Sequence, residues 1–142
     1  MSNRKVIAVS GGFDPVHVGH LRMFESASLL GELVVIVNSD EWLHKKKGYQ
    51  FMEFEDRCEI IRGFRCVSHV VGVKDNDGTV CSALREINPD YFANGGDRID
   101  GNTPEKDLCE DLGIEMVWSV GGKKIRSSSI IVEKSKNSDI EK

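Results

Sequence analysis

The sequence predicts an α/β fold built on one doubly wound parallel sheet of about five strands. Short, continuous apolar runs such as residues 33–37 are typical of strands buried on both faces. These runs alternate along the chain with segments whose apolar residues recur at helical spacing. The chain has 142 residues, 39% of them hydrophobic, which suffices for one core and not for two ordinary domains. We therefore expect one domain at residues 1–135 and a polar tail at residues 136–142.

The first strand, turn and helix are predicted within residues 5–30. The apolar run at residues 5–10 predicts a buried strand that stops at a glycine pair. Residues 18–30 carry apolar side chains near helical spacing, and Gly31 is the expected C-terminal stop of that helix. The run at residues 33–37 then predicts a second buried strand, parallel to the first.

The same alternation continues through the rest of the chain. The lysine-rich stretch after the second strand is interpreted as a polar surface segment. Helices are then expected at residues 53–64, 80–87 and 103–112, strands at 67–73, 91–93 and 114–118, and a last helix starting within 127–129. Asp75 belongs to a segment interpreted as turn material. This order of elements is that of a single-domain, Rossmann-like sheet, in which ligands bind beyond the carboxyl ends of the strands.

Charge and composition exclude several classes of function. The net charge of −4 and the absence of a global basic field argue against a nucleic-acid partner, whereas a small anion needs only local clusters such as residues 44–47 and 123–126. The N-terminal apolar run is too short for a secretory signal or a membrane span, so we expect a cytoplasmic protein without a membrane partner. The four cysteines form no C-x-x-C pair and are expected to be buried or half-buried free thiols.

Glycines and polar residues follow four of the predicted strands and should meet at one edge of the sheet. They are Gly11-Gly12-Phe13-Asp14, Asn38-Ser39-Asp40, Gly95-Gly96-Asp97 and the serine run Ser127-Ser128-Ser129. In the first loop, glycines let backbone N–H groups approach a phosphate, and the following helix directs its positive end at the same anion.

His17 and His20 lie in the first turn of that helix, and their i, i+3 spacing places both imidazoles on one face. There they can donate hydrogen bonds to a phosphorus centre. Two other interpretations stay open: the glycine pair is only a tight turn, or the histidines are a metal pair whose third ligand is not evident in the sequence.

Residues 12–20, with the letters GFDPVHVGH, closely resemble the signature of the cytidylyltransferase-like nucleotidyltransferases, whose HxGH turn is their defining element. The likeness covers about residues 5–132 and is strongest to glycerol-3-phosphate cytidylyltransferases and heptose-phosphate adenylyltransferase domains.

The resemblance implies a role for each matching residue. His17 and His20 would contact the triphosphate and stabilise the transition state, and Lys46 would bind phosphate, with Lys45 and Lys47 as alternatives. Further nucleotide contacts are implied for Gly12, Phe13, Asp14, Gly95, Gly96, Asp97, Ser127, Ser128 and Ser129, and contact with the acceptor phosphate for Arg57. Arg126 stands where the family has its first serine, so the register of the serine motif stays open.

The implied reaction transfers a nucleoside monophosphate from CTP or ATP to a small phosphate monoester, a polyol or sugar phosphate, with release of pyrophosphate. Magnesium would neutralise the triphosphate, with no protein metal ligand, and the family suggests a homodimer. The main alternative is a nucleotide-binding sensor that has lost turnover. A fragment of a class I aminoacyl-tRNA synthetase shares the HxGH form, but this short, acidic chain has no room for a tRNA-binding domain.

Overall fold

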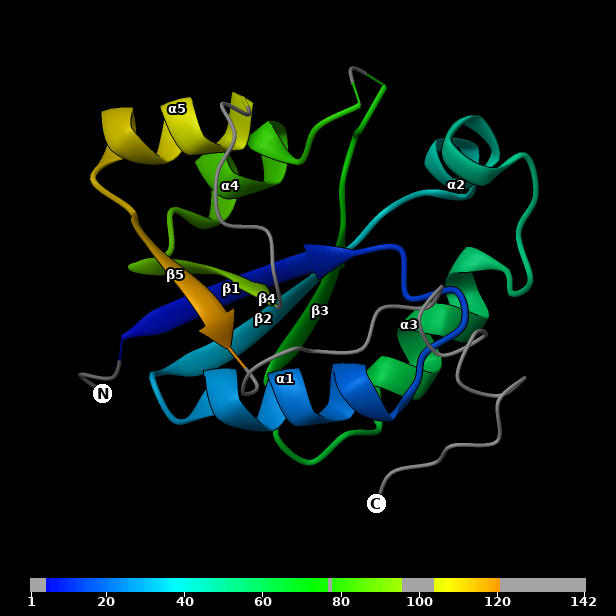
Figure 1. Cartoon of the computed structure of the whole chain (residues 1–142), viewed down its shortest axis with the longest axis horizontal. Helices are drawn as coiled ribbons and strands as arrows, with labels where there is room; N and C mark the ends of the chain where they lie inside the picture. Colours follow the sequence, from blue (N-terminus) through cyan, green and yellow to red (C-terminus); the bar gives the residue numbers. More distant parts are fainter. Residues whose placement is uncertain (1–4, 77, 96–103, 121–142) are drawn as a thin grey trace.

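The computed structural model describes residues 5–76, 78–95 and 104–120, and within them five parallel strands form one sheet (Figure 1). The strands are β1 (Val6–Gly11), β2 (Glu32–Val37), β3 (His69–Gly72), β4 (Tyr91–Gly95) and β5 (Glu115–Val120). The helices are α1 (Val18–Ser28), α2 (Asp40–Lys47), α3 (Phe54–Arg62), α4 (Cys81–Ile87) and α5 (Pro104–Leu112). The predicted α/β, Rossmann-like fold is confirmed.

The order of the strands across the sheet is β3-β2-β1-β4-β5, with β1 at the centre. The chain first winds from β1 through β2 to β3, then crosses to the other side of β1 for β4 and β5. The direction of winding therefore reverses between β1 and β4. In sheets of this kind the crevice at such a reversal, beyond the carboxyl ends of the strands, is where ligands bind.

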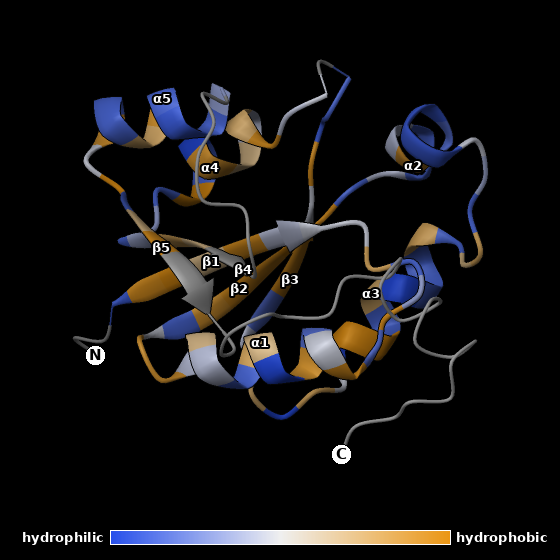
Figure 2. Cartoon of the chain, viewed as in Figure 1, coloured by the Kyte–Doolittle hydropathy of each residue, from blue (hydrophilic) through white to orange (hydrophobic). Residues whose placement is uncertain are grey.

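Helices cover both faces of the sheet, and each face has its own apolar core. In Figure 1, α1 and α3 lie on one side of the strands, and α4 and α5 lie on the other. In Figure 2 the hydrophobic residues, in orange, are concentrated in the strands, and the helices around them include many hydrophilic residues, in blue. Successive residues of β1 alternate between the cores, because Ile7 and Val9 pack with α1 and α3 while Ala8 packs with α4.

Helix α2 was not predicted from the sequence, and interpreting its residues as a surface segment without an element was wrong. The helix buries only Leu43, so it lacks the apolar stripe by which the other helices were recognised. The residues at its two ends, a serine and a glycine, are the sequence features typical of a helix here. The Ser39 hydroxyl caps the N-terminus by accepting from the Trp42 N–H at 3.0 Å, and Gly48 closes the C-terminus in the left-handed conformation, with φ at 88°.

Gly31 is not the stop of the first helix. Helix α1 ends at Ser28, and its C-cap Leu29 keeps a right-handed backbone. A side-chain carbon at Gly31 would collide with the Lys5 carbonyl oxygen, which accepts the Glu32 N–H at 2.8 Å. Gly31 therefore allows β2 to begin close beside β1. The other predicted elements are present with ends shifted by a few residues, and the last helix and the tail lie outside the described residues.

The cysteines are free thiols, as predicted, with Cys58, Cys81 and Cys109 buried and Cys66 half-buried. Burial raises the pKa of the Cys109 thiol to about 11, which keeps it protonated and unreactive. Within the described residues, every helix is too short or too polar to cross a membrane.

Candidate active site at the end of β1

The turn after β1 delivers His17 and His20 to the first turn of α1. His17 is the N-cap residue, and its Nδ1 accepts a hydrogen bond from the Gly19 N–H at 3.0 Å. His20 makes the reciprocal bond of a capping box, in which its Nδ1 accepts from the His17 N–H at 3.1 Å. Since both Nδ1 atoms act as acceptors, the proton of each neutral imidazole is carried by Nε2. The helix cap thus sets the tautomer of both histidines and makes each Nε2 a donor.

The two imidazole rings are stacked, with centroids 3.7 Å apart and planes inclined by 24°. The edge of the Phe13 ring supports His20 at a centroid distance of 4.8 Å. Burial, with a smaller contribution from the neighbouring His17, lowers the pKa of His20 to about 3. His20 is therefore neutral near pH 7 and can act there as a neutral hydrogen-bond donor.

Phe13 lies beneath the histidines and not on the surface of the crevice. Its backbone is left-handed, with φ at 53°, and its ring packs over Gly11, where a side-chain carbon would come within 3.0 Å of the ring. Only 3% of Phe13 is exposed, so it can meet a nucleotide through its backbone alone. A larger residue at position 11 would displace the ring that supports His20.

Asp14 is also buried, and its carboxylate anchors the loop between α2 and α3. The backbone N–H groups of Phe51 and Met52 each donate to it at 2.7 Å, and the Lys47 ammonium lies 3.1 Å away. Burial alone would raise the pKa of Asp14, but these bonds and the lysine charge hold it below its usual value. The carboxylate thus joins the loop after β1 to the following chain.

The three lysines that the sequence offered for phosphate binding have different surroundings in the structure. Lys46 is exposed, with its ammonium 5.2 Å from the centre of the Trp42 ring. That ring lies beside Gly12, where a side-chain carbon would come 3.4 Å from it. Lys47 is bonded to the loop itself, because its ammonium donates to the Asp14 carbonyl at 2.8 Å. Lys45 is exposed on α2.

Arg57 is fully buried and ties the surrounding segments together. Its Nη1 donates to the carbonyls of Gly12 at 2.7 Å and Asn38 at 2.9 Å. Its Nη2 donates to the Asp40 carboxylate at 2.6 Å, and its Nε to the Met52 carbonyl at 3.1 Å. The acceptor-phosphate contact predicted for Arg57 stays a prediction, and it requires the guanidinium to exchange one of these partners.

The sequence does contain a signal for this burial. Position 57 falls on the stripe formed by Phe54, Cys58 and Ile61, which faces the sheet. A charged residue on such a stripe is buried only when its donors are satisfied.

A second buried carboxylate, Asp75, was missed when its segment was interpreted as a turn. It accepts from the Asn38 side-chain amide at 2.9 Å, from the Ser39 N–H at 3.0 Å and from the Ser39 hydroxyl at 2.7 Å. Asp75 therefore holds the polar residues after β2 against the chain that follows β3. The sequence gives no sign of the contact between Ser39 and Asp75, because these residues are 36 positions apart.

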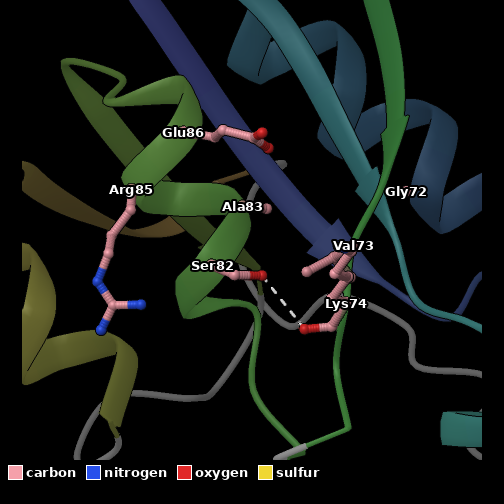
Figure 3. Close-up of a pocket in the computed structure, with 7 residues that line it drawn as sticks. All are labelled: Gly72, Val73, Lys74, Ser82, Ala83, Arg85 and Glu86. Atoms are coloured by element: carbon pink, nitrogen blue, oxygen red, sulfur yellow. Dashed lines mark hydrogen bonds between the residues drawn. The ribbon is translucent and has the colours of Figure 1, made fainter.

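Two hollows flank this part of the sheet. One, of about 340 Å³, lies beside the HxGH turn and is lined by His17 and the apolar side chains Val16, Val18, Leu21, Met52, Ile60 and Phe64. The other, of about 740 Å³, lies between the end of β3 and α4 (Figure 3). There the Ser82 hydroxyl donates to the Lys74 carbonyl at 3.2 Å, and Arg85 and Glu86 stand on the same helix. The second hollow is not lined by any residue of the HxGH turn.

The remaining predicted contacts fall at or beyond the limits of the described chain. Gly95 is the last residue of β4, next to a register shift in the pairing with β5. Gly96, Asp97 and the run Ser127, Ser128 and Ser129 lie outside the described residues. Within residues 5–76, 78–95 and 104–120, no group of three His, Cys, Asp or Glu side chains could hold a metal ion, so the histidine pair has no third ligand there.

Comparisons with known proteins agree on one family. The family model described as cytidylyltransferase-like matches residues 8–134. Bifunctional protein HldE of Syntrophotalea carbinolica is 32% identical over 136 residues, which cover 92% of this chain and 27% of that protein. FAD synthase of Pyrococcus horikoshii is 37% identical over 115 residues, which cover 78% of this chain and 72% of the synthase. This chain thus spans about a quarter of the HldE relative and most of the FAD synthase.

A solved structure shares the fold. The lipopolysaccharide core biosynthesis protein from Thermoplasma volcanium matches with a TM-score of 0.67 over 88% of this chain and 98% of that chain, at 22% identity.

Proposed function

This chain belongs to the cytidylyltransferase-like family of nucleotidyltransferase enzymes, and from that premise we propose that it transfers a nucleoside monophosphate from CTP or ATP to a small phosphate monoester. The observation that carries the proposal is the cap of α1. It presents two imidazoles with protonated Nε2 atoms at the positive end of a helix. Such donors match the charge that develops on the oxygens of a phosphorus centre.

The proposed reaction is an in-line displacement. An oxygen of the acceptor phosphate attacks the α-phosphorus of the nucleotide and forms a new P–O bond. The bond from the α-phosphorus to the bridging oxygen of the β-phosphate breaks, and pyrophosphate leaves with the electron pair. Because the attacking oxygen is already anionic, no general base is needed, and catalysis consists of positioning and charge stabilisation. His17, His20 and the N–H groups at the start of α1 supply these effects, and Lys46 adds positive charge.

Magnesium is part of the proposal as the counter-ion of the triphosphate. The acidic side chains near the loop are already engaged by protein donors, because Asp14 accepts backbone N–H groups and Asp40 is bonded to Arg57. Magnesium keeps several waters and is commonly bound through substrate phosphates, so phosphate oxygens and water would hold it here. When bound, it would neutralise charge on the leaving pyrophosphate.

The acceptor is proposed to be a polyol or sugar phosphate. A homodimer, which the resemblance suggests, and a cytoplasmic location, which the short N-terminal apolar run suggests, stay predictions.

Release of pyrophosphate tests the proposal directly. The chain should release it from CTP or ATP with magnesium when glycerol 3-phosphate or a sugar phosphate is supplied. Turnover should fall about 100-fold to 1,000-fold in His17→Asn and His20→Ala, because each removes one donor. His17→Asn is informative because asparagine is a good N-cap, so the helix should persist while the Nε2 donor is lost.

Two results would contradict this assignment. Near-normal turnover in either variant would mean that the histidines do not carry the reaction. Tight nucleotide binding without pyrophosphate release, over a broad set of acceptors, would favour a sensor that has lost turnover.

A further inference from the structure

Helix α2 packs directly against the loop after β1, and Gly12 is the residue that it meets. A side-chain carbon at Gly12 would come within 2.8 Å of the Leu43 side chain and 3.4 Å of the Trp42 ring. Any larger residue at this position would therefore displace the side chains of α2. Because Gly12 belongs to the loop that leads to His17, the side chains of α2 that touch it lie beside the proposed phosphate site.

The Trp42 ring connects this contact to a cation. Lys46 follows Trp42 by four residues on α2, a spacing that places two side chains on the same face of a helix. The Lys46 ammonium lies 5.2 Å from the centre of the ring, within the range of a cation–π contact. One indole ring thus adjoins both Gly12 and the ammonium of Lys46.

Trp42 is itself fixed, because a turn after β3 holds both its backbone and its ring. The Trp42 N–H donates to the Ser39 hydroxyl at 3.0 Å, and that hydroxyl donates to the buried Asp75 carboxylate at 2.7 Å. The indole Nε1 donates to the Gly78 carbonyl at 3.4 Å. The Gly78 N–H donates to the Asp75 carbonyl at 2.8 Å, so these two residues lie in one turn. The position of the ring therefore depends on contacts with a second segment of the chain and not on α2 alone.

A fixed ring solves a problem that an exposed lysine poses for phosphate binding. The lysine side chain has many rotamers, and holding one of them costs conformational entropy. Lys46 is exposed, so a phosphate would otherwise have to fix its side chain at the moment of binding. The face of the indole attracts the ammonium before the phosphate arrives, and the three N–H donors of an ammonium leave some to point away from the ring.

We propose that Trp42 is a positioning residue, whose ring holds the Lys46 ammonium beside the glycine turn, where the phosphates of the nucleotide bind. This inference rests on the proposed function, in which Lys46 adds positive charge at the phosphorus centre. Trp42 needs no contact of its own with either substrate, because it acts through Lys46. The turn that contains Asp75 and Gly78 acts in the same way through Trp42.

A double-mutant cycle on nucleotide affinity tests the proposal. Isothermal titration with magnesium would give the Kd of CTP and of ATP for the wild type, Trp42→Leu, Lys46→Met and the double variant. For the nucleotide that the wild type binds more tightly, Trp42→Leu should weaken binding about 3-fold to 30-fold, the range of a cation–π contact. In the Lys46→Met background, Trp42→Leu should change the Kd less than about 2-fold, because the cation that the ring holds is gone.

Two further variants separate positioning from damage to the fold. Trp42→Phe keeps an aromatic face, so its Kd should stay within about 2-fold of the wild-type value. Lys45→Met makes the same change of charge at the neighbouring position, but the ring contact belongs to Lys46. Trp42→Leu should therefore weaken nucleotide binding equally with and without Lys45→Met. The kcat/KM for pyrophosphate release should follow the same pattern as the affinities.

The proposal would be overturned if Trp42→Leu weakened nucleotide binding as much in Lys46→Met as in the wild type, because the ring would then act independently of the lysine. An unchanged affinity in Trp42→Leu, an equal loss in Trp42→Phe, or a wild type that binds neither nucleotide would also overturn it. Failure of the proposed function alone looks different. Pyrophosphate release would then be absent with every acceptor, while the coupling between Trp42 and Lys46 in nucleotide affinity persisted.

Discussion

At the scale of single residues, the buried His20 makes the stability of the domain depend on pH. Its pKa is about 3 in the folded chain and about 6.5 when unfolded. Between these values the unfolded state binds the proton and the folded state does not, so stability falls as the pH falls through this window. From about pH 7.5 to about pH 5, His20 should cost the folded state about 2 kcal/mol. Urea unfolding at several pH values measures this loss.

Substitution of His20 by glutamine isolates this effect, since glutamine retains an acceptor and does not titrate in this range. The His20→Gln variant should lose about 2 kcal/mol less than the wild type over the same interval. The exposed His69 provides the matched control, and His69→Gln should keep the wild-type dependence. If the free energy of unfolding fell equally with pH in the wild type and in His20→Gln, His20 would not be held neutral by burial.

At the scale of elements, one buried arginine joins the loop after β1, the end of β2 and the start of α2. Replacing Arg57 by methionine preserves much of its volume but leaves the carbonyls of Gly12 and Asn38 without their donor. Breaking such a buried charged network costs about 3–5 kcal/mol. We expect Arg57→Met to lower the free energy of unfolding by that amount, as measured by urea denaturation, and to raise the KM for the nucleotide because the loop loses its support.

The same helix supplies the control for this prediction. Arg62 lies on the exposed side of α3, and Arg62→Met should change stability by less than about 0.5 kcal/mol. Arg57→Lys keeps the charge but not the fork of donors, so it should recover only part of the stability. If Arg57→Met were as stable as Arg62→Met, the hydrogen bonds around the guanidinium would not support the loop.

The strands were predictable because each is a short apolar run, and that signal is local. Helix α2 was not predicted, because it buries only Leu43 and depends on its capping residues, so it has no apolar periodicity. The histidine turn was predictable because its motif is contiguous, whereas the roles of Asp14 and Arg57 depend on hydrogen bonds to residues about 40 positions away. Spacing along the chain contains no information on such contacts. The contact of the Trp42 ring with Gly12 likewise follows from the folded chain and not from residue type.

At the scale of the whole molecule, the topology leaves one side of β1 for each of the two substrates of the proposed reaction. β1 is central, with β4 on the side expected for the nucleotide and β2 on the side from which α2 and α3 extend. The loop after β1 lies between these sides and leads into the first turn of α1, which carries both histidines. An acceptor and a nucleotide that enter from opposite sides meet at this loop, which is the geometry that an in-line displacement requires.

This arrangement predicts that the donor nucleotide stabilises the folded domain in the absence of any acceptor. A ligand at about 100 times its Kd adds about 2.7 kcal/mol to the free energy of unfolding. For a domain of this size that corresponds to a rise in Tm of about 5–10 °C. Thermal unfolding with magnesium and either CTP or ATP should show this rise for the true donor, and a smaller one for the other nucleotide and for GTP. Chelation of magnesium should reduce the rise, because the triphosphate would carry its full charge into the loop. Equal shifts with all three nucleotides would indicate a site that holds phosphates without selecting a base, and no shift with any would contradict a nucleotide site at the end of β1.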